Sequence, residues 1–297
     1  STHKFKKATI VQESALQYWK DTYLTGLESL SWPTSFLRAK SVETVISEYG
    51  KALIFDIEQK AIRSFTTIPY TKLRDLSEQS QSSLFHTVVA LFGFYLNAIL
   101  DLKSIDLFVP IVEQYDASSL SEIKSSSNIL PIRIERLKEM VKTQIAEVRN
   151  QILEGMSQNV SIEQILSATK TKRSSIPNVL VTQFIEGNQY LSLSNVVAES
   201  LLIPPIHSDY DLTLAFQIKD NETLHLELTT GEKLSKSVGA LLLEQFVIFL
   251  HQDFKQAVLY STVFGSKLQG NQSQQIDSLN SSNDENKKMV AQSINQP

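Results

Sequence analysis

One stretch of the sequence, TVVALFGFYLNAIL at 87–100, restricts the possible folds more than any other. Drawn as a helix it is apolar on nearly every side, and such a helix is stable only where it is buried all round. It has fourteen residues and includes Asn97, whereas a membrane-spanning helix needs about 20 apolar residues. The stretch therefore predicts a central core helix, with Ser82 or Ser83 as its N-cap.

Composition excludes several classes of protein. The chain has 297 residues, of which 42% are hydrophobic and 20% charged, as in an ordinary globular protein with an ample core. A net charge of −4 gives no electrostatic footprint for nucleic acid, and we expect no membrane partner. The absence of cysteine removes disulfides, thiolate nucleophiles and cysteine-based zinc sites, and it agrees with a cytoplasmic location.

The order of periodic segments predicts the fold class. Apolar residues recur at helical spacing in some segments and alternate in others, and Gly155 stands where the fourth helix should end. We expect helices at 13–30, from 70, from 82, 137–155, from 161 and 235–258, and strands at 52–57, 61–68, 105–111, 129–134 and four more between 178 and 230. This order predicts an α/β protein, an α+β sandwich with a mixed sheet and helices mainly on one face.

The same sequence argues against a doubly wound nucleotide-binding domain, because no glycine-rich turn follows a strand. Domain limits follow from a change in composition at Gly265. Of the last 33 residues, 17 are Ser, Asn or Gln, and such a segment cannot bury enough apolar surface to fold. We expect an N-terminal extension at 1–12, one folded unit at 13–264 and a flexible tail or linker at 265–297.

The histidines lie far apart in the sequence, and no two have the spacing of a helical metal site. They are His3, His86, His207, His225 and His251. We expect a core position for His86, a sheet surface for His225 and a helix C-terminus for His251. His207 precedes two aspartates at the entry to a strand, where a carboxylate can orient an imidazole as a general base. The alternative, which we favour, is a solvated turn.

Four quoted stretches are similar to a known family. They are LQYWKDTYLTGLESLSWP at 16–33, SLFHTVVALFGFYLNAI at 83–99, NILPIRI at 128–134 and YDLTLAFQIKDNETLHLELTTGEKLSKSVGALLLEQFVIFL at 210–250. In this order they resemble the C-terminal lobe of nonribosomal peptide synthetase condensation domains, over about residues 13–264. The resemblance implies a chloramphenicol-acetyltransferase-like half-domain.

In that family two lobes enclose a tunnel, into which carrier proteins present thioesters on phosphopantetheine arms. The resemblance places four residues of this chain at the tunnel or lobe interface. Asp211 matches the Asp of a Phe-Asp-Leu-Thr-Leu motif, Asn128 and Arg133 match an Asn-Thr-Leu-Pro-Leu-Arg strand, and Gln158 is what remains of His-Gln-x-x-Pro. The resemblance implies no directly bound cofactor and no metal.

The family's adjacent histidine pair, on the N-terminal lobe, has no counterpart among the histidines of this chain. We therefore expect a non-catalytic platform for a carrier protein or neighbouring synthetase domains. The alternative is the C-terminal half of an active condensation domain, which forms amides once its N-terminal lobe is supplied. A third hypothesis is a free-standing acyltransferase with His207 as base. The expected partners are a carrier protein and either an adenylation domain or the missing lobe.

Overall fold

The computed structural model describes residues 2–27, 30–37, 62–112, 127–138, 140–158, 160–172, 178–184, 209–219, 222–252 and 254. The elements in these ranges are α1 (Thr2–Thr22), η1 (Thr34–Phe36), β1 (Ile62–Pro69), α2 (Thr71–Gln79), α3 (Leu84–Ile99), β2 (Ser104–Val112), β3 (Ser127–Glu135), α4 (Val141–Ser157), α5 (Ile162–Ala168), β4 (Val179–Gln183), β5 (Leu212–Lys219), β6 (Thr223–Thr230) and α6 (Lys236–Leu250).

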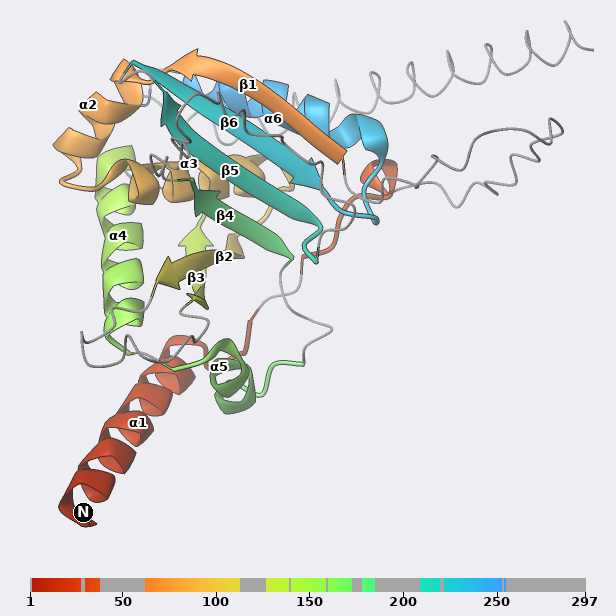
Figure 1. Ribbon diagram of the computed structural model, residues 1–297. Coiled ribbons are helices and arrows are strands. Elements are labelled where there is room, and N and C mark those ends of the chain that lie inside the picture. Colours follow the sequence, from red (N-terminus) through yellow and green to blue (C-terminus); the bar gives the residue numbers. More distant parts are fainter. Residues whose placement is uncertain are drawn as a thin grey trace, which may run out of the picture.

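The described strands form one mixed sheet of six, in the order β1-β6-β5-β4-β2-β3. The β4–β5 and β2–β4 pairs are parallel, and the other pairs are antiparallel. Helices α3 and α6 pack behind the sheet in Figure 1, while the opposite face of β1, β6 and β5 is turned to the viewer. The predicted mixed sheet with helices mainly on one face is confirmed.

Helix α3 is the buried centre of this arrangement. Every residue from Thr87 to Ile99 is buried, as its all-round apolar sequence predicts. Ser83, one of the two predicted caps, begins the helix. At Gly93 a Cβ atom would stand 2.5 Å from the side chain of Ile134, so the missing side chain lets α3 lie against β3.

Register divides the strands into two sets of side chains, because successive residues point to opposite faces. The set that faces the helices is apolar and almost wholly buried. It comprises Leu107, Val109, Leu130, Ile132, Ile134, Val179, Val181, Leu212, Leu214, Phe216, Leu224, Leu226 and Leu228. In β5 and β6, alternation in the sequence therefore specified which face meets the core.

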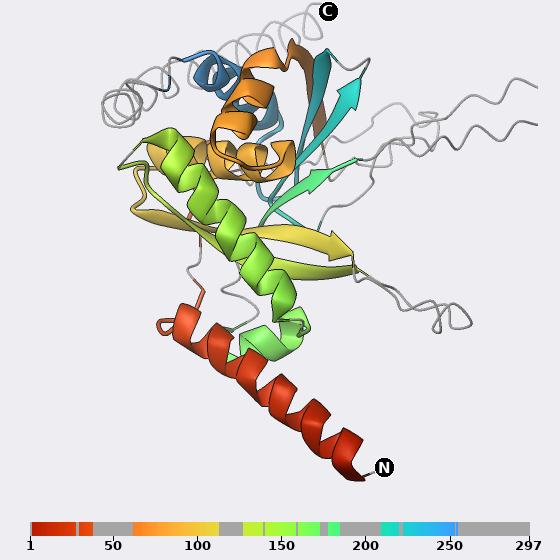
Figure 2. The same cartoon turned by 90° about the vertical axis from the view of Figure 1, so that its left-hand side faces the viewer.

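Helix α1 and α5 lie beyond the β3 edge of the sheet (Figure 2). An edge strand leaves a row of backbone N–H and C=O groups without strand partners. Pro131 suits this strand because proline has no N–H to leave unpaired, and its carbonyl accepts a hydrogen bond of 2.9 Å from the Tyr23 hydroxyl. The turn after α1 thus satisfies part of the sheet edge.

Glycine at position 155 does not end a helix, as the sequence predicts, but lies inside α4, whose C-cap is Gln158. A Cβ at Gly155 would stand 3.1 Å from the Trp19 ring and 3.2 Å from Leu130. Close packing against α1, which local sequence does not reveal, explains this glycine. Helix α4 also begins after Leu137, which the sequence places within it.

Helix α1 differs from expectation at both ends, since it runs from Thr2 to Thr22 without a break at residue 12. Two predicted strands, at 52–57 and at 194–203, and the proposed tail at 265–297 lie outside the described residues. Among the described helices, none is by itself long and apolar enough to cross a membrane. The α2–α3 pair meets that test jointly, with a 99° bend at its break.

His86 lies in the first turn of α3, half-buried, rather than deep in the core. The Ser83 N–H donates to His86 Nδ1 at 3.4 Å, and the His86 N–H donates to Ser83 Oγ at 3.2 Å. This is a capping box with histidine in the place usually held by Glu or Gln. Burial first, and then the Arg149 guanidinium, lower the pKa of His86, so the ring stays a neutral acceptor.

We expect His86→Gln to weaken the loss of stability at acidic pH. Below about pH 6.5 the His86 ring is protonated in the unfolded chain, whereas its lowered pKa keeps it neutral to lower pH in the folded chain. The contribution of His86 to stability is therefore fully present above that pH and decreases as the pH falls below it. Glutamine keeps the cap without titrating. Thermal unfolding of both proteins between about pH 7 and pH 5 measures this, and superimposable profiles would contradict it.

Candidate functional site

Arg133 on β3 makes a dense set of contacts inside the protein. Its guanidinium pairs with both carboxylate oxygens of Asp106 on β2, at 2.8 and 2.7 Å. It also donates to the Gly26 carbonyl at 3.1 Å and stacks on the Tyr23 ring at 4.9 Å. The Asp106 side chain has no exposed surface. Burial and then this carboxylate raise the pKa of Tyr23 well above its ordinary value, so the phenol remains a donor.

Asp211 lies immediately before β5 and is buried. Its Oδ2 accepts a hydrogen bond of 3.1 Å from the Trp32 indole N–H, and its Oδ1 lies 3.2 Å from Lys233 Nζ. Its backbone carbonyl accepts from the Gly231 N–H at 2.9 Å. Asp211 therefore joins three segments that are distant in the sequence.

Asn128 and Gln158 meet the connection between α4 and α5. Asn128 Nδ2 donates to the Val160 carbonyl at 2.7 Å, and its Oδ1 accepts from the Ile129 N–H at 2.8 Å. The Gln158 carbonyl accepts from the Trp19 indole at 3.4 Å. Both residues thus fix the chain that leads from α4 to α5 and the helix packed on it.

The four residues do not gather around one space. They divide into two pairs, and each pair holds segments of the chain in place. Arg133 and Asp211 bind the segment between α1 and η1, at Gly26 and Trp32. This segment continues to Phe36, whose carbonyl accepts from the Ser235 N–H at 2.8 Å. We call residues 23–27 and 30–37 the strap; they run from the β3 edge to the start of α6.

Three residues that complete these contacts were not singled out in the sequence: Asp106, Trp32 and Lys233. A signal existed for Asp106, since a carboxylate within the apolar strand 105–111 needs a partner when buried. Nothing local points to the other two, because they approach Asp211 only through the fold. His207 lies outside the described residues.

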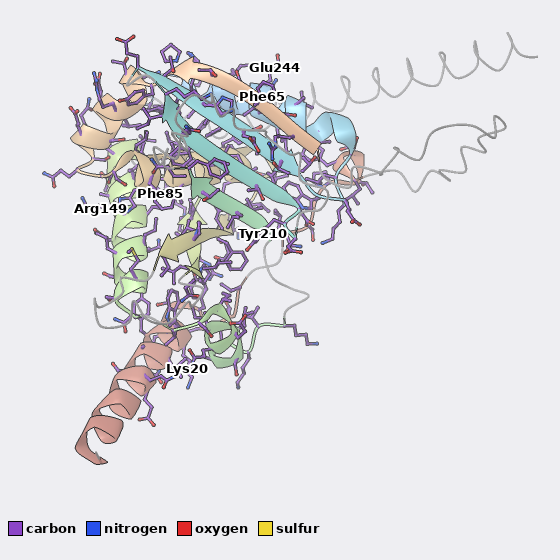
Figure 3. All side chains as sticks on the ribbon, in the orientation of Figure 1. Lys20, Phe65, Phe85, Arg149, Tyr210 and Glu244 are labelled. Atoms are coloured by element: carbon purple, nitrogen blue, oxygen red, sulfur yellow. The ribbon has the colours of Figure 1, made fainter. Side chains whose placement is uncertain are left out.

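The face of β1, β5 and β6 that points away from the helices is largely polar. It carries Thr67, Thr213, Gln217, His225 and Thr229, and Arg63 pairs with Glu227 at 2.7 Å. Phe65 is the large apolar exception, 70% exposed and 6.0 Å from the His225 ring (Figure 3). His225 therefore has the predicted sheet-surface position.

His225 Nδ1 lies 3.3 Å from Thr67 Oγ1, and burial first, then Lys219, lower the pKa of its ring. His251 is the C-cap of α6, as expected, with Nδ1 2.7 Å from the Val247 carbonyl. In the described part of the chain, no three His, Asp or Glu side chains are close enough together to hold a metal ion.

The fold has solved counterparts, although no family model and no curated protein matches the sequence. The condensation domain of the monacolin K polyketide synthase MokA is 12% identical, with a TM-score of 0.61 over 84% of this chain and 57% of that one. The X-domain in its complex with OxyB from teicoplanin biosynthesis is 15% identical, with a TM-score of 0.63 over 83% and 54%.

The chain has a condensation-domain fold. A four-domain nonribosomal peptide synthetase bound to AMP and glycine also contains it, with a TM-score of 0.62 and 14% identity over 80% of this chain and 19% of that one. The chain spans about half the length of the MokA condensation domain and of the X-domain. Identities this low establish the fold alone, since one fold serves many functions.

Replacing Asp211 by Asn is expected to lower the free energy of unfolding by about 1.5–3 kcal/mol, the usual value of a hydrogen bond to a charged group. Lys233→Gln is the matched control on the other partner. Because Lys233 is 62% exposed, it should cost only about 0–1 kcal/mol. Urea unfolding followed by tryptophan fluorescence measures both, and equal losses would show that the buried Trp32–Asp211 contact contributes nothing special.

Proposed function

We propose that this chain is a condensation-type C-terminal lobe that serves as a non-catalytic platform for a carrier protein or neighbouring synthetase domains. The proposal rests on one observation: polar residues that match the family's motifs are bonded to other residues of this chain. Arg133 and Asp211 bind Asp106, Gly26, Trp32 and Lys233 within the chain. These interactions hold the strap in place, and the side chains that make them do not gather around one space.

Two further observations support the platform. The face of β1, β5 and β6 away from the helices is polar and internally paired, as at Arg63–Glu227, which suits a lobe that folds without a second one against this face. The sequence also contains no adjacent pair of histidines, so the imidazole that guides the acceptor amine in the family is missing from this chain.

A second candidate is the C-terminal half of an active condensation domain, with the N-terminal lobe supplied by another polypeptide. The observation that favours it is length, since the chain spans 57% of one condensation domain with the same fold. Here the amide would form in a tunnel between two lobes, and the strap would set how this lobe meets the other. Phosphopantetheine arms of carrier proteins would bring both substrates.

A transfer assay separates the two candidates. The chain is mixed with two carrier proteins, one loaded with a donor and one with an acceptor aminoacyl group, with and without a separate N-terminal lobe that contains the His-His motif. The platform predicts carrier or adenylation-domain binding, measured by calorimetry, and no amide product in either mixture. A product that requires the added lobe and disappears when its second motif histidine is replaced would establish the second candidate.

Formation of the amide product by the chain alone would contradict both candidates and would favour a free-standing acyltransferase. In that case His207→Ala tests the remaining base. Its expected result under the platform proposal is no change in carrier binding, because the contacts that carry the proposal are those of Arg133 on β3 and Asp211 before β5. Loss of binding in Arg133→Met with normal folding would instead link the strap to partner recognition.

A further inference from the structure

Helices α2 and α4 lie side by side in both views of the molecule (Figures 1 and 2), and a groove runs between them. One cavity of about 320 Å³ is lined by Lys72, Asp75, Leu76, Gln79, Met140, Val141, Lys142 and Phe254. A second cavity of about 310 Å³ is lined by Gln79, Ser80, Gln81, Lys142, Thr143, Ala146 and Arg149. The two cavities share Gln79 and Lys142, so they form one groove along α4.

Each wall of the groove is one face of a helix. Four lining residues of α2 are spaced as i, i+3, i+4 and i+7: Lys72, Asp75, Leu76 and Gln79. Three lining residues of α4 are spaced as i, i+4 and i+7: Lys142, Ala146 and Arg149. Residues at these intervals lie in a row along one side of a helix. Two such rows with a hollow between them, and a small side chain in the middle of one, fit a third helix.

The walls are positively charged, although the whole chain has a net charge of −4. Of the four charged residues that line the groove, only Asp75 is acidic, and it lies 3.9 Å from the Arg74 guanidinium. The three others are basic: Lys72, Lys142 and Arg149. The side chain of Met140, the N-cap residue of α4, makes no capping hydrogen bond, so the positive end of the helix dipole adds to the same charge.

The three basic side chains have no carboxylate within ion-pair distance in the part of the chain that the structure describes. Lys72 donates to the His251 carbonyl at 3.0 Å, and Arg149, labelled in Figure 3, donates to the Gln81 carbonyl at 2.6 Å. These acceptors are uncharged, and Lys142 is exposed. A partner with carboxylates therefore meets positive charge that no described carboxylate has compensated.

One end of the groove is apolar. Leu76 and Phe254 pack against the core and also line the first cavity, and Met140 is 62% exposed beside them. An exposed methionine near a leucine and an aromatic ring is a surface that an apolar side chain of a partner stabilises by covering it. The groove thus combines an apolar end with basic walls.

We propose that this groove binds an acidic amphipathic helix of a partner protein. Lys142 and Arg149 are seven residues apart, about 10 Å along one side of α4, so two carboxylates at i and i+7 of the bound helix can pair with both. Leucine-like residues one turn beyond the first carboxylate then cover Met140. The inference does not rest on the proposed function, because Arg133 and Asp211, which carry that proposal, do not line the groove.

Designed peptides test the proposal, with binding to the full chain followed by fluorescence anisotropy. The probe is an alanine-rich helical peptide of about 18 residues, with two glutamates seven positions apart and two leucines one turn from one of them. It is made with this pattern in either chain direction. We expect saturable binding by one of the two, at least about tenfold tighter than binding of the matched peptide with lysine in place of both glutamates.

Lys142→Glu reverses one charge of the groove, and a glutamate in the first turn of a helix is compatible with folding. It should weaken binding of the glutamate peptide about fivefold and strengthen binding of the lysine peptide by a similar factor. Lys20→Glu is the matched control, because it makes the same change in net charge on α1, away from the groove (Figure 3). It should alter either affinity by less than about twofold.

Equal effects of the two variants, or equal affinities of the glutamate and lysine peptides, would overturn the proposal. The absence of saturable binding would overturn it too, whether another part of the chain or a second copy fills the groove. Full displacement of the peptide by inorganic phosphate would assign the groove to a small anion and count equally against a helix. A platform that binds its carrier through another face would leave the proposed function intact under each of these results.

Discussion

Replacing Arg133 by methionine is expected to lower the free energy of unfolding by about 3–5 kcal/mol, the cost of breaking a buried ion pair on one side only. The substitution leaves the carboxylate of Asp106, which has no exposed surface, without its bidentate partner. It also removes the hydrogen bond to the Gly26 carbonyl that holds the strap. Methionine keeps an unbranched stem against the Tyr23 ring, so the charge is the main change.

Arg136→Met is the matched control, three residues further along the chain. Its guanidinium pairs with Asp101 at the same 2.7 Å, but that carboxylate is 70% exposed, so the expected loss is about 0–1 kcal/mol. Urea unfolding curves compare the two. Adding Asp106→Leu to Arg133→Met should recover most of the stability, since two apolar residues need no partner. Equal losses for the two arginines, or no recovery in the double variant, would contradict this account.

Replacing Trp19 by alanine is expected to cost about 3–5 kcal/mol, as for other large buried aromatic residues. The ring is 1% exposed, fills the space left by the absent side chain of Gly155 and stacks on Tyr23 at 6.1 Å. Its loss removes the wedge between α1 and α4. Helix α1 should then open more often than the rest of the lobe, because Trp19 is the largest of its buried side chains.

Amide hydrogen exchange resolved along the chain measures the local opening of α1 separately from global unfolding. Protection should fall most in α1 and less in α3, the buried centre of the lobe. Gln17→Ala is the control on the same helix, because Gln17 donates to Asp21 on the exposed surface; the change in stability should be less than about 0.5 kcal/mol. A uniform loss of protection across α1 and α3 would contradict the local role of Trp19.

Elements with one dominant period were predictable from the sequence. The all-round apolar helix became α3, with Ser83 as its cap, and Ser161 caps α5 through Gln164 as its position implies. Strands β5 and β6 follow their alternation, since a shift by one residue would turn their apolar side chains outward. These features depend on neighbours in sequence, so sequence reveals them.

The sequence identified the candidate site residues only by position. The residues that they contact could be found only in the folded structure. Arg133 and Asp211 follow from the resemblance, yet their partners Asp106 and Trp32 lie 27 and 179 residues away in the chain. The same limit explains Gly155, where the reason for glycine is the Trp19 ring of another helix. His86 was misplaced because an apolar setting conceals a capping role.

Local sequence by itself determined the helix and strand types, the buried face of β5 and β6 and the class of the fold, because burial imposes periods of 3.6 and 2 on apolar residues. Only the tertiary structure decided the order of the strands, the path of the strap and the pairing of the buried charges. Those depend on groups distant along the chain meeting where water is excluded, and a buried carboxylate such as Asp106 is tolerable only once its partner has arrived.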